Sequence, residues 1–429
     1  MNYNQTLEYL YNSVPMFQKI GSSAYKEGLE NTEALDAYLN HPHTNFKTIH
    51  VGGTNGKGST SHTLAAILQS AGYRVGLYTS PHLVDFRERI RINGTCISEE
   101  FVVNFVQQHR EFFEPLSPSF FELTTAMAFD YFAQEKVDIA VIEVGLGGRL
   151  DCTNIISPLL SIITNISNDH NQFLGDTLAK IAFEKAGIIK KETPAIIGEY
   201  VEETLPVFME KAQQVNAPLY LAQDNLQIDF KKSHTTADGW EYYTKDYGIM
   251  RGELGGLCQI YNSNSILLAV KLLKEKRILI SQENVMNGFK NVAELTGLMG
   301  RWQKLQESPR VVCDTGHNIG GIQHITNQLK QQKYNTLRIV LGMVNDKDIN
   351  GVLAILPKEA TYYFTKASVA RALPEHEIAQ LAAKHGLKGG TFENVKSATQ
   401  AALADAQEDD FIFIGGSSFI VADLLTFWK

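Results

Sequence analysis

The stretch His50-Val51-Gly52-Gly53-Thr54-Asn55-Gly56-Lys57-Gly58-Ser59-Thr60 decides the fold of this chain. An apolar run ends at Val51, a glycine-rich turn follows, and a helix-forming run begins near Ser59. A strand, a glycine turn and a helix in this order direct backbone N–H groups and the positive end of the helix dipole into one concavity, which suits phosphate oxygens. We therefore predict a nucleotide-binding loop made of Gly53, Thr54, Asn55, Gly56, Lys57, Gly58, Ser59 and Thr60.

The side chains of this loop fit the chemistry of a bound triphosphate. Lys57 supplies a positive charge for the β- and γ-phosphates, and the hydroxyls of Ser59 and Thr60 reach a phosphate or a metal ion. The loop departs from the common pattern at two positions, because Val51 replaces the first glycine and Gly58 follows the lysine where Ser or Thr is expected. An ordinary strand–turn–helix corner is the alternative, but it does not require this density of glycine, lysine and hydroxyl residues.

Composition and charge limit the class of protein. A chain of 429 residues is too long for one ordinary core, so two domains are expected, and 44% hydrophobic with 20% charged residues describes a soluble globular protein. A formal charge of −8 without a basic stripe argues against a nucleic-acid partner. The 4 cysteines are far apart, the start of the chain resembles no signal peptide, and no apolar run could span a membrane. These features predict a cytoplasmic protein with small-molecule substrates and no membrane partner.

Strand-like and helix-like segments alternate along the chain, which favours parallel sheets with helices on both faces. Residues 224–255 are polar with a short alternating run, and we predict that they form antiparallel strands added to the main sheet. The strands predicted in the first half are 47–51, 74–79, 137–144, 159–164, 194–198 and 218–221, and the helices are 59–71, 99–113, 119–134, 177–189, 202–215, 260–274 and 282–293.

A second alternation begins after Gly300, and Gly297 and Gly300 supply a flexible connection at residues 295–301. We predict a P-loop-type, mostly parallel α/β domain over residues 1–296 and a smaller Rossmann-like α/β domain over residues 300–429, with ligands in the cleft between them. The second domain is expected to contain strands at 310–314, 337–342, 361–365 and 411–415 and helices at 318–331, 374–385, 395–406 and 418–428.

Three side chains that follow predicted strands suggest a metal site. Glu143 lies near the end of an apolar strand, and Ser80 and His170 follow two other strands. Because the carboxyl ends of parallel strands share one edge of the sheet, these groups are expected to lie near the phosphate loop, where they could complete the shells of two Mg²⁺ ions. A glutamate facing solvent and a polar loop histidine are the alternatives. His41 and His43 flank Pro42 in a polar connection, and we interpret them as surface residues.

Lys185 occupies an unusual position in the sequence. It falls on the apolar stripe of the predicted helix 177–189, and a buried ammonium group costs desolvation energy. One interpretation is a side chain that extends along the surface to reach water. The other is an uncharged amine that carries CO₂ as a carbamate near Mg²⁺. The pattern by itself favours the first.

Weaker signals mark two further groups of residues. Ser119, Phe120, Phe121 and Glu122 open a helix where a flat aromatic ligand could stack, although most of that helix is core. Asp314 and His317 follow a strand of the second half and point towards the expected cleft. Arg301, at the hinge, either meets a phosphate or ribose or forms a salt bridge in the linker, and the sequence leaves both open.

The ordered motifs of this chain resemble folylpolyglutamate synthase, the folate-extending branch of the Mur ligase superfamily. The resemblance runs from about Tyr3 to the C-terminus. The motifs that carry it in the first half are Gly53–Ser59, Tyr78–His82, Glu143–Asp151, Asn168–His170 and Glu184–Gly187, and in the second half Gly300–Arg301, Asp314–Asn318, Asp346–Asp348 and Arg371–Pro374.

The resemblance implies a role for each matching residue. It implies that Lys57 and its loop hold ATP, that Lys185 is carbamylated, and that His317 lies near the incoming glutamate. It further implies that Ser80, Glu143 and His170 bind Mg²⁺, that Asn262, Arg301 and Asp314 contact ATP, and that Ser119, Phe120, Phe121, Glu122, Leu150, Asp151 and Cys152 line the pteridine pocket.

The implied reaction is ATP-dependent amide formation by a protein that is expected to be a monomer. A folate carboxylate takes the γ-phosphate to give an acyl phosphate, which the amine of L-glutamate then attacks. A bifunctional enzyme that also acts as a dihydrofolate synthase, adding the first glutamate to dihydropteroate, shares nearly every motif and stays open. A cell-wall Mur ligase is less favoured, because about fifty residues precede the loop here, too few for a nucleotide-sugar domain. A non-enzymatic ATP-binding module would leave the metal-binding residues without a purpose.

Overall fold

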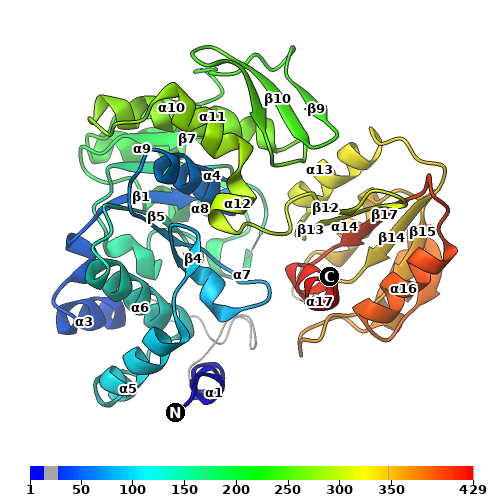
Figure 1. The fold of residues 1–429 in the computed structure, drawn as a ribbon, viewed down its shortest axis with the longest axis horizontal. Helices are drawn as coiled ribbons and strands as arrows, with labels where there is room; N and C mark the ends of the chain where they lie inside the picture. The colour runs from blue at the N-terminus through cyan, green and yellow to red at the C-terminus, as the bar shows by residue number, and fades with distance from the viewer. Residues whose placement is uncertain (14–27, 170, 346, 429) are drawn as a thin grey trace.

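The computed structural model describes residues 1–13, 28–169, 171–345 and 347–428. Its strands form an eight-stranded sheet, a three-stranded sheet and a six-stranded sheet. Figure 1 shows the first two sheets with their helices on one side of the molecule and the six-stranded sheet on the other. The mixed α/β class with two large sheets was predicted from the sequence, and the structure confirms it.

The eight-stranded sheet has the order β4-β3-β2-β5-β1-β6-β7-β8. Strand β1 lies inside it and pairs in parallel with β5 on one side and β6 on the other. Neighbouring residues of the inner strands pack into different hydrophobic clusters, Ile162 into one and Ile163 into another, so these strands are buried on both faces. The strand bounds are β1 (Lys47–Gly52), β2 (Val75–Tyr78), β3 (Ile90–Ile92), β4 (Thr95–Cys96), β5 (Ile139–Glu143), β6 (Leu160–Ile163), β7 (Ala195–Ile197) and β8 (Leu219–Leu221).

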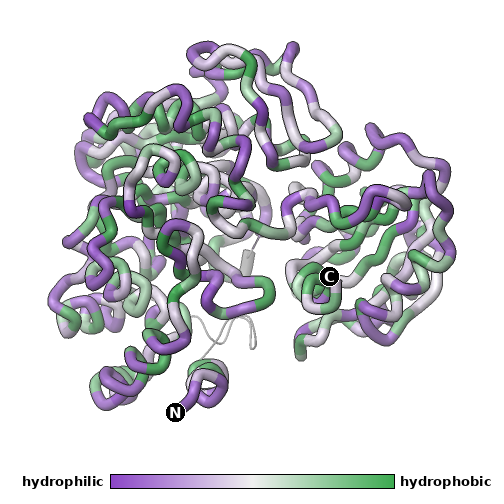
Figure 2. Tube along the Cα trace, in the orientation of Figure 1, coloured by the Kyte–Doolittle hydropathy of each residue, from purple (hydrophilic) through white to green (hydrophobic). Residues whose placement is uncertain are grey.

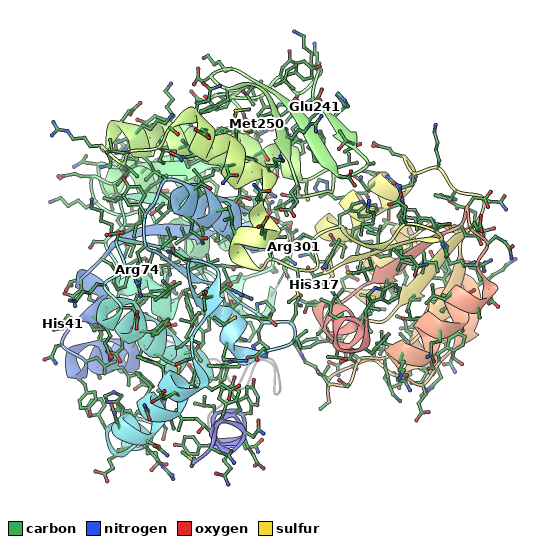
Figure 3. The ribbon with its side chains drawn as sticks, viewed as in Figure 1. His41, Arg74, Glu241, Met250, Arg301 and His317 are labelled. Carbon is green, nitrogen blue, oxygen red and sulfur yellow. The ribbon has the colours of Figure 1, made fainter. Side chains whose placement is uncertain are left out.

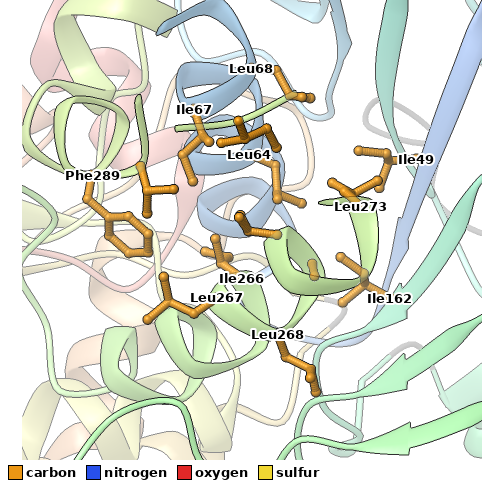
Figure 4. Close-up of a cluster of buried hydrophobic side chains, with 14 of the residues drawn as sticks. Ile49, Leu64, Ile67, Leu68, Ile162, Ile266, Leu267, Leu268, Leu273 and Phe289 are labelled. Carbon is orange, nitrogen blue, oxygen red and sulfur yellow. The ribbon is translucent and has the colours of Figure 1, made fainter. Parts of the chain in front are cut away.

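Helices cover both faces of this sheet. The helix α4, which follows the phosphate loop, packs with α10 and α11 in the largest buried cluster, and Figure 4 shows Leu64 and Ile67 of α4 beside Leu267 and Phe289. The helix bounds in this part are α1 (Tyr3–Ser13), α3 (Glu30–Tyr38), η2 (Pro42–Thr44), α4 (Lys57–Ser70), η3 (Phe86–Arg89), α5 (Glu99–Leu116), α6 (Phe120–Gln134), η4 (Cys152–Ile155), α7 (Asn171–Leu174), α8 (Leu178–Ala186), α9 (Leu205–Gln214), α10 (Gln259–Glu275), α11 (Gln282–Lys290) and α12 (Val292–Thr296).

The antiparallel strands lie in a different place from the one predicted. The segment 224–255 does form antiparallel strands, β9 (His234–Thr236), β10 (Gly239–Thr244) and β11 (Gly248–Gly252), but they make a separate three-stranded sheet. The prediction that they extend the main sheet is wrong. The antiparallel strands of the main sheet are β3 and β4, which come from the segment after the cis Ser80–Pro81 bond.

The six-stranded sheet has the order β12-β13-β17-β14-β15-β16 and is parallel except at β12. Figure 2 shows hydrophobic residues along its strands and hydrophilic residues on the outer helices. The sequence analysis missed β12, β16 and α14. The bounds are β12 (Gln303–Gln306), β13 (Arg310–Asp314), α13 (Ile319–Leu329), β14 (Leu337–Leu341), α14 (Ile349–Ile355), β15 (Thr361–Phe364), α15 (Glu375–Lys384), β16 (Lys388–Thr391), α16 (Val395–Asp405), β17 (Phe411–Gly415) and α17 (Ser418–Phe427).

Helix α12 ends at Gly297, whose φ of 70° ends the helix and starts the connection to β12. The connection falls within the predicted hinge, although the division of the chain at residues 296 and 300 stays a prediction. Among the described residues, no helix has the length and apolar character needed to cross a membrane.

Shortening a core side chain in α4 should lower the stability of the eight-stranded sheet and the helices packed on it. Leu64 has 0% of its surface exposed and packs between the sheet and α10, so Leu64→Ala removes buried apolar surface and leaves a cavity. We expect a loss of about 2–5 kcal/mol in the free energy of unfolding, measured by urea denaturation. Leu279→Ala, at a leucine that is 79% exposed, is the matched control and should leave the transition unchanged. Equal effects of the two substitutions would contradict this packing.

Candidate active site

The phosphate loop connects β1 to α4, and two glycines in it have backbone angles that other residues avoid. Gly53 has φ 133° and Gly56 has φ 86°. A Cβ atom at Gly53 would overlap the side chain of Thr164, and one at Gly56 would overlap that of Asn262. Thr164 Oγ1 also donates to the carbonyl oxygen of Asn55 at 2.6 Å. The end of β6 and the start of α10 therefore fix the shape of the loop.

Two lysine side chains meet at the carbonyl oxygen of Gly53. Lys57 Nζ donates to this oxygen at 3.1 Å and to that of Thr54 at 3.1 Å, and Lys185 Nζ donates to the Gly53 oxygen at 2.9 Å. Lys185 is only 4% exposed, and burial, followed by the nearby charge of Lys57, lowers its pKa to about 7. The amine does not reach bulk water, so the interpretation of a surface-reaching side chain is wrong. The neutral amine is therefore accessible near neutral pH.

Glu143 and Ser80 lie beside each other next to the start of α4. The Ser80 backbone N–H donates to Glu143 Oε2 at 3.3 Å, and Glu143 is 4% exposed, which contradicts the alternative of a glutamate facing solvent. Burial raises the pKa of Glu143 to about 6, opposed by the charges of Lys57 and Arg301. Of the three residues predicted to bind metal, these two are therefore together. His170 lies outside the described residues.

The predicted substrate residues line one cavity together with the phosphate loop. Phe120 lies under the guanidinium of Arg89, 5.1 Å from its ring centroid, and the ring of Phe121 packs directly on the backbone of Gly145. A flat ligand can therefore lie among aromatic rings close to the triphosphate site. The members of the predicted set that line this cavity are Ser119, Phe120, Phe121, Glu122, Leu150, Asp151 and Cys152, and the cavity also exposes Gly53, Thr54, Lys57, Ser80, Lys185 and His317.

Several polar groups of this cavity have their hydrogen-bonding atoms occupied by the protein. The Glu122 carboxylate accepts from the Ser119 N–H, and Ser119 Oγ accepts from the Glu122 N–H at 3.2 Å, which caps α6. Asp151 Oδ1 accepts from the N–H and hydroxyl of Thr153, and Asp151 Oδ2 accepts from the N–H of Leu146 at 2.9 Å. The main role of these groups in the structure is therefore to hold the walls of the cavity in shape.

The six-stranded sheet closes the other side of the cavity. Asp169 Oδ1 pairs with Lys347 Nζ at 2.6 Å, and Asp169 Oδ2 accepts from Asn318 Nδ2 at 3.2 Å and lies 3.5 Å from His317 Nε2. Asn318 also exchanges hydrogen bonds of 3.0 and 3.1 Å with Asn55 of the phosphate loop. Figure 3 shows Arg301 and His317 between the two halves of the molecule. The two halves therefore meet directly over the phosphate loop.

Four charged residues of this cavity were assigned no role from the sequence: Arg89, Asp169, Lys347 and Arg371. Arg89 is the last residue of η3, which follows β2, and nothing in its local sequence pattern marks it. Asp169, Lys347 and Arg371 each belong to a motif that carries the family resemblance, and this membership was the available signal for them.

The residues predicted to contact ATP lie on different sides of the phosphate loop. Asn262 faces Gly56, and its Nδ2 donates to Gln259 Oε1 at 3.0 Å. Arg301 lies over Gly58 and donates to the Gly300 carbonyl and the Thr315 hydroxyl. Among the described residues it forms no salt bridge, so the alternative of a linker salt bridge is not supported there. Asp314 accepts from the N–H groups of Trp302 and Gly316 at 2.7 and 2.8 Å, and burial raises its pKa. Asp314 thus braces the hinge beside Arg301.

A second group of potential metal ligands lies outside the cavity. His41 Nδ1 and His43 Nδ1 each contact one carboxylate oxygen of Asp36 at 2.6 Å. The His41 side chain is 60% exposed, as predicted for a surface residue, but that of His43 is only 17% exposed. The surface interpretation of His43 is therefore wrong, because both imidazoles are needed to satisfy a buried carboxylate.

Comparisons with known proteins agree with this geometry. Residues 51–263 match the Mur ligase middle domain, and residues 300–418 match the Mur ligase glutamate ligase domain. The dihydrofolate synthase/folylpolyglutamate synthase of Bacillus subtilis is 33% identical over 93% of this chain and 94% of its own length.

Two solved structures have the same fold over nearly the whole chain. Escherichia coli FolC in complex with DHPP and ADP has a TM-score of 0.84 and 31% identity over 99% of this chain and 97% of its own. The bifunctional folylpolyglutamate synthase/dihydrofolate synthase of Yersinia pestis with Mn, AMPPNP and L-glutamate bound has a TM-score of 0.82 and 30% identity over 99% of this chain and 98% of its own.

The buried Glu143 should reduce the stability of the protein without ligands. Its pKa of about 6 in the folded protein exceeds the value of about 4.3 in an unfolded chain, so the folded state binds more protons than the unfolded state between these values and stability falls as pH rises through this window. Glu143→Gln removes this dependence and is expected to raise the free energy of unfolding at pH 8 by about 2 kcal/mol.

Chemical denaturation at a series of pH values between about 4 and 8 measures this effect. Glu202→Gln, at an exposed glutamate, is the control and should leave the pH dependence unchanged. A Glu143→Gln protein that is less stable than the wild type at pH 8 would show that the carboxylate stabilises the fold and would contradict the assignment.

Proposed function

This chain belongs to the dihydrofolate synthase/folylpolyglutamate synthase branch of the Mur ligase superfamily, and from this premise we propose how its cleft joins L-glutamate to a folate carboxylate. As a member of this branch, it is an ATP-dependent ligase that forms a C–N bond. The observation that carries the proposal is a single cavity lined by Lys57 of the phosphate loop, by Ser80 and by the aromatic side chains Phe120 and Phe121. Glu143 lies directly behind Ser80, whose N–H it accepts.

The acceptor carboxylate lies between the aromatic pocket and the phosphate loop in this proposal. One of its oxygens attacks the γ-phosphorus of ATP, the bond to the β,γ-bridging oxygen breaks, and ADP leaves. The amine of glutamate then attacks the acyl carbon, loses a proton, and phosphate leaves with the oxygen that came from the acceptor. Lys57 neutralises charge on the transferred group, and the N–H groups at the start of α4 hold the phosphate oxygens.

Ser80, Glu143 and His170 are the residues that we assign to Mg²⁺. The fit rests on the buried carboxylate of Glu143 beside Ser80, because carboxylate and hydroxyl oxygens are ligands that Mg²⁺ prefers. When bound, two such ions supply positive charge next to the transferred phosphoryl group and the attacking carboxylate. The solved Yersinia pestis relative contains Mn with AMPPNP, which supports a divalent ion together with the nucleotide here.

Lys185 is proposed to carry a carbamate. A neutral amine adds to the carbon of CO₂ and loses one proton, which leaves an N-bound carboxylate with a negative charge. The lowered pKa of about 7 makes the neutral amine available, and the cationic Lys57 nearby stabilises the anion once it forms. The carbamate would then add an anionic group beside the metal residues.

The incoming glutamate is assigned to the side of the cavity formed by the six-stranded sheet. His317, Lys347 and Arg371 line this side; the positive charges of Lys347 and Arg371 suit the two carboxylates of glutamate. Because Lys347 also pairs with Asp169, binding of glutamate couples to the contact between the two halves of the molecule. Closure over the acyl phosphate would exclude water, which protects this intermediate from hydrolysis.

A second acceptor, dihydropteroate, is favoured by one observation. The Bacillus subtilis relative carries the names of both activities and aligns with 93% of this chain. The same pocket would bind the pterin of either acceptor, and the reaction at the carboxylate would be the same. We therefore propose both reduced folates and dihydropteroate as acceptors.

Release of phosphate with each acceptor in turn tests this function. The purified protein with ATP, Mg²⁺ and L-glutamate is expected to release phosphate and form an amide with a reduced folate and with dihydropteroate, but not without an acceptor. Lys57→Ala should reduce turnover by at least about 1,000-fold while the circular dichroism spectrum is unchanged. Lys231→Ala, at an exposed lysine, is the control. Turnover retained by Lys57→Ala would remove the loop from the mechanism.

Labelled bicarbonate tests the carbamate. With carbon-13 bicarbonate near pH 8, the wild type is expected to give a carbamate resonance in the carbon-13 spectrum. Lys185→Ala should lose this resonance, and Lys180→Ala, at an exposed lysine of the same helix, should keep it. The absence of a resonance in the wild type would assign Lys185 a role as a simple hydrogen-bond donor to Gly53.

A further inference from the structure

A buried chain of hydrogen bonds connects the central strand β1 to the wall of the substrate cavity. His50 Nε2 lies 2.8 Å from Thr153 Oγ1, and Thr153 Oγ1 contacts Asp151 Oδ1. Asp151 Oδ2 accepts from the Leu146 N–H at 2.9 Å. His50 and Thr153 are each 0% exposed and Asp151 is 5% exposed. The chain therefore runs through the protein interior, out of contact with bulk water.

The donors in this chain can be assigned from the number of protons available. Asp151 receives the N–H groups of Leu146 and Thr153 in addition to the Thr153 hydroxyl, and an ionised carboxylate can accept all three. The hydroxyl has a single proton, which it gives to Asp151. Towards His50 the same oxygen can then only accept, so the proton lies on Nε2 of His50.

The surroundings of His50 agree with this assignment. Burial lowers its pKa to about 3, so the ring is neutral near pH 7 and carries one N–H. Its other nitrogen, Nδ1, is buried and has no hydrogen-bond partner among the described residues. The other tautomer would place the N–H on Nδ1, where no described residue accepts it. With the N–H on Nε2, the donor is used at Thr153 and only a lone pair on Nδ1 stays without a partner among the described residues.

The far end of the chain sets the position of the glycine loop that follows Glu143. Gly145 and Leu146 line the substrate cavity, and the ring of Phe121 rests on Gly145 so closely that a Cβ there would overlap it. A Cβ at Gly148 would lie 2.9 Å from the carbonyl oxygen of Glu184 in α8, so this glycine is also closely packed. A shift of the Leu146 N–H would therefore move the aromatic wall of the cavity, whereas the phosphate loop is held separately by Thr164 and Asn262.

We propose that His50 is a positioning residue for the acceptor pocket, acting through the Thr153 hydroxyl and the Asp151 carboxylate on the loop that carries Gly145 and Leu146. His50 touches neither ATP nor the acceptor in this role. It holds Asp151 in one orientation, and Asp151 holds the loop against Phe121. The inference depends on the proposed function, because it names the acceptor pocket as the part of the site that the chain controls.

Paired substitutions at Thr153 separate this role from a general effect on folding. Thr153→Val keeps the shape and removes the hydroxyl, whereas Thr153→Ser keeps the hydroxyl. We expect Thr153→Val to raise the KM for the acceptor by about tenfold with little change in the KM for ATP, and Thr153→Ser to recover most of the loss. His50→Leu and His50→Gln form a second pair, because only glutamine can donate to the hydroxyl. Thr399→Val is the control, since the Thr399 hydroxyl is buried and no residue in the described part of the chain pairs with it.

Two results would overturn the proposal. One is an unchanged acceptor KM in Thr153→Val, and the other is an equal rise in the KM values for acceptor and ATP that serine does not rescue. Both require a wild type that is active with an acceptor, so an inactive wild type counts against the proposed function instead. Nitrogen-15 NMR of labelled histidine gives a readout that needs no turnover: His50 should show a protonated Nε2 and a bare Nδ1 from about pH 6 to 8. Protonation at Nδ1 would contradict the donor assignment in this chain of hydrogen bonds.

Discussion

The carbonyl oxygen of Gly53 is the point on which the site depends. It accepts hydrogen bonds from Lys57 and Lys185, at 3.1 and 2.9 Å, and two ammonium groups at one oxygen repel each other. Burial, followed by the nearby charge of Lys57, lowers the pKa of Lys185 to about 7, so its neutral form is accessible near neutral pH and the repulsion is eased. The arrangement needs the φ of 133° at Gly53, where a Cβ would overlap Thr164. The backbone of one glycine thus sets the charge balance beside the triphosphate.

The same region illustrates how function opposes stability. Glu143 is buried with a raised pKa, and Lys185 is buried with a lowered one, so each group is held in a place where its charged form is unfavourable. In the proposed function, substrates and divalent ions supply the charges that make these places favourable. The surrounding core, formed by α4, α10 and the parallel strands, provides the apolar packing that offsets their cost.

The parts of the site that depend on the order of strands and helices could be predicted from the sequence. Glu143, Ser80 and the loop at Lys57 follow parallel strands, whose carboxyl ends share an edge, so their proximity followed from the alternation of strands and helices. The sequence signal for the aromatic pocket was weak, because a helical stripe that contains Phe120 is also typical of a hydrophobic core. The prediction of this pocket therefore depended on the family resemblance. The pairing of Asp169 with Lys347 depends on how the two halves meet, which no local pattern records. For residues 224–255, alternation predicted the antiparallel strands, but it does not determine which sheet they join.

The central claim is that the γ-phosphate passes from ATP to the acceptor carboxylate within this cleft, with Lys57 on one side and the aromatic pocket on the other. Transfer of oxygen-18 measures this step directly. An acceptor labelled with oxygen-18 in its reacting carboxylate is incubated with ATP, Mg²⁺ and L-glutamate, and the released phosphate is analysed by mass spectrometry. Our account predicts one oxygen-18 atom in each phosphate released with amide formation. Phosphate that contains oxygen from water instead would contradict an acyl phosphate and the arrangement of the site described above.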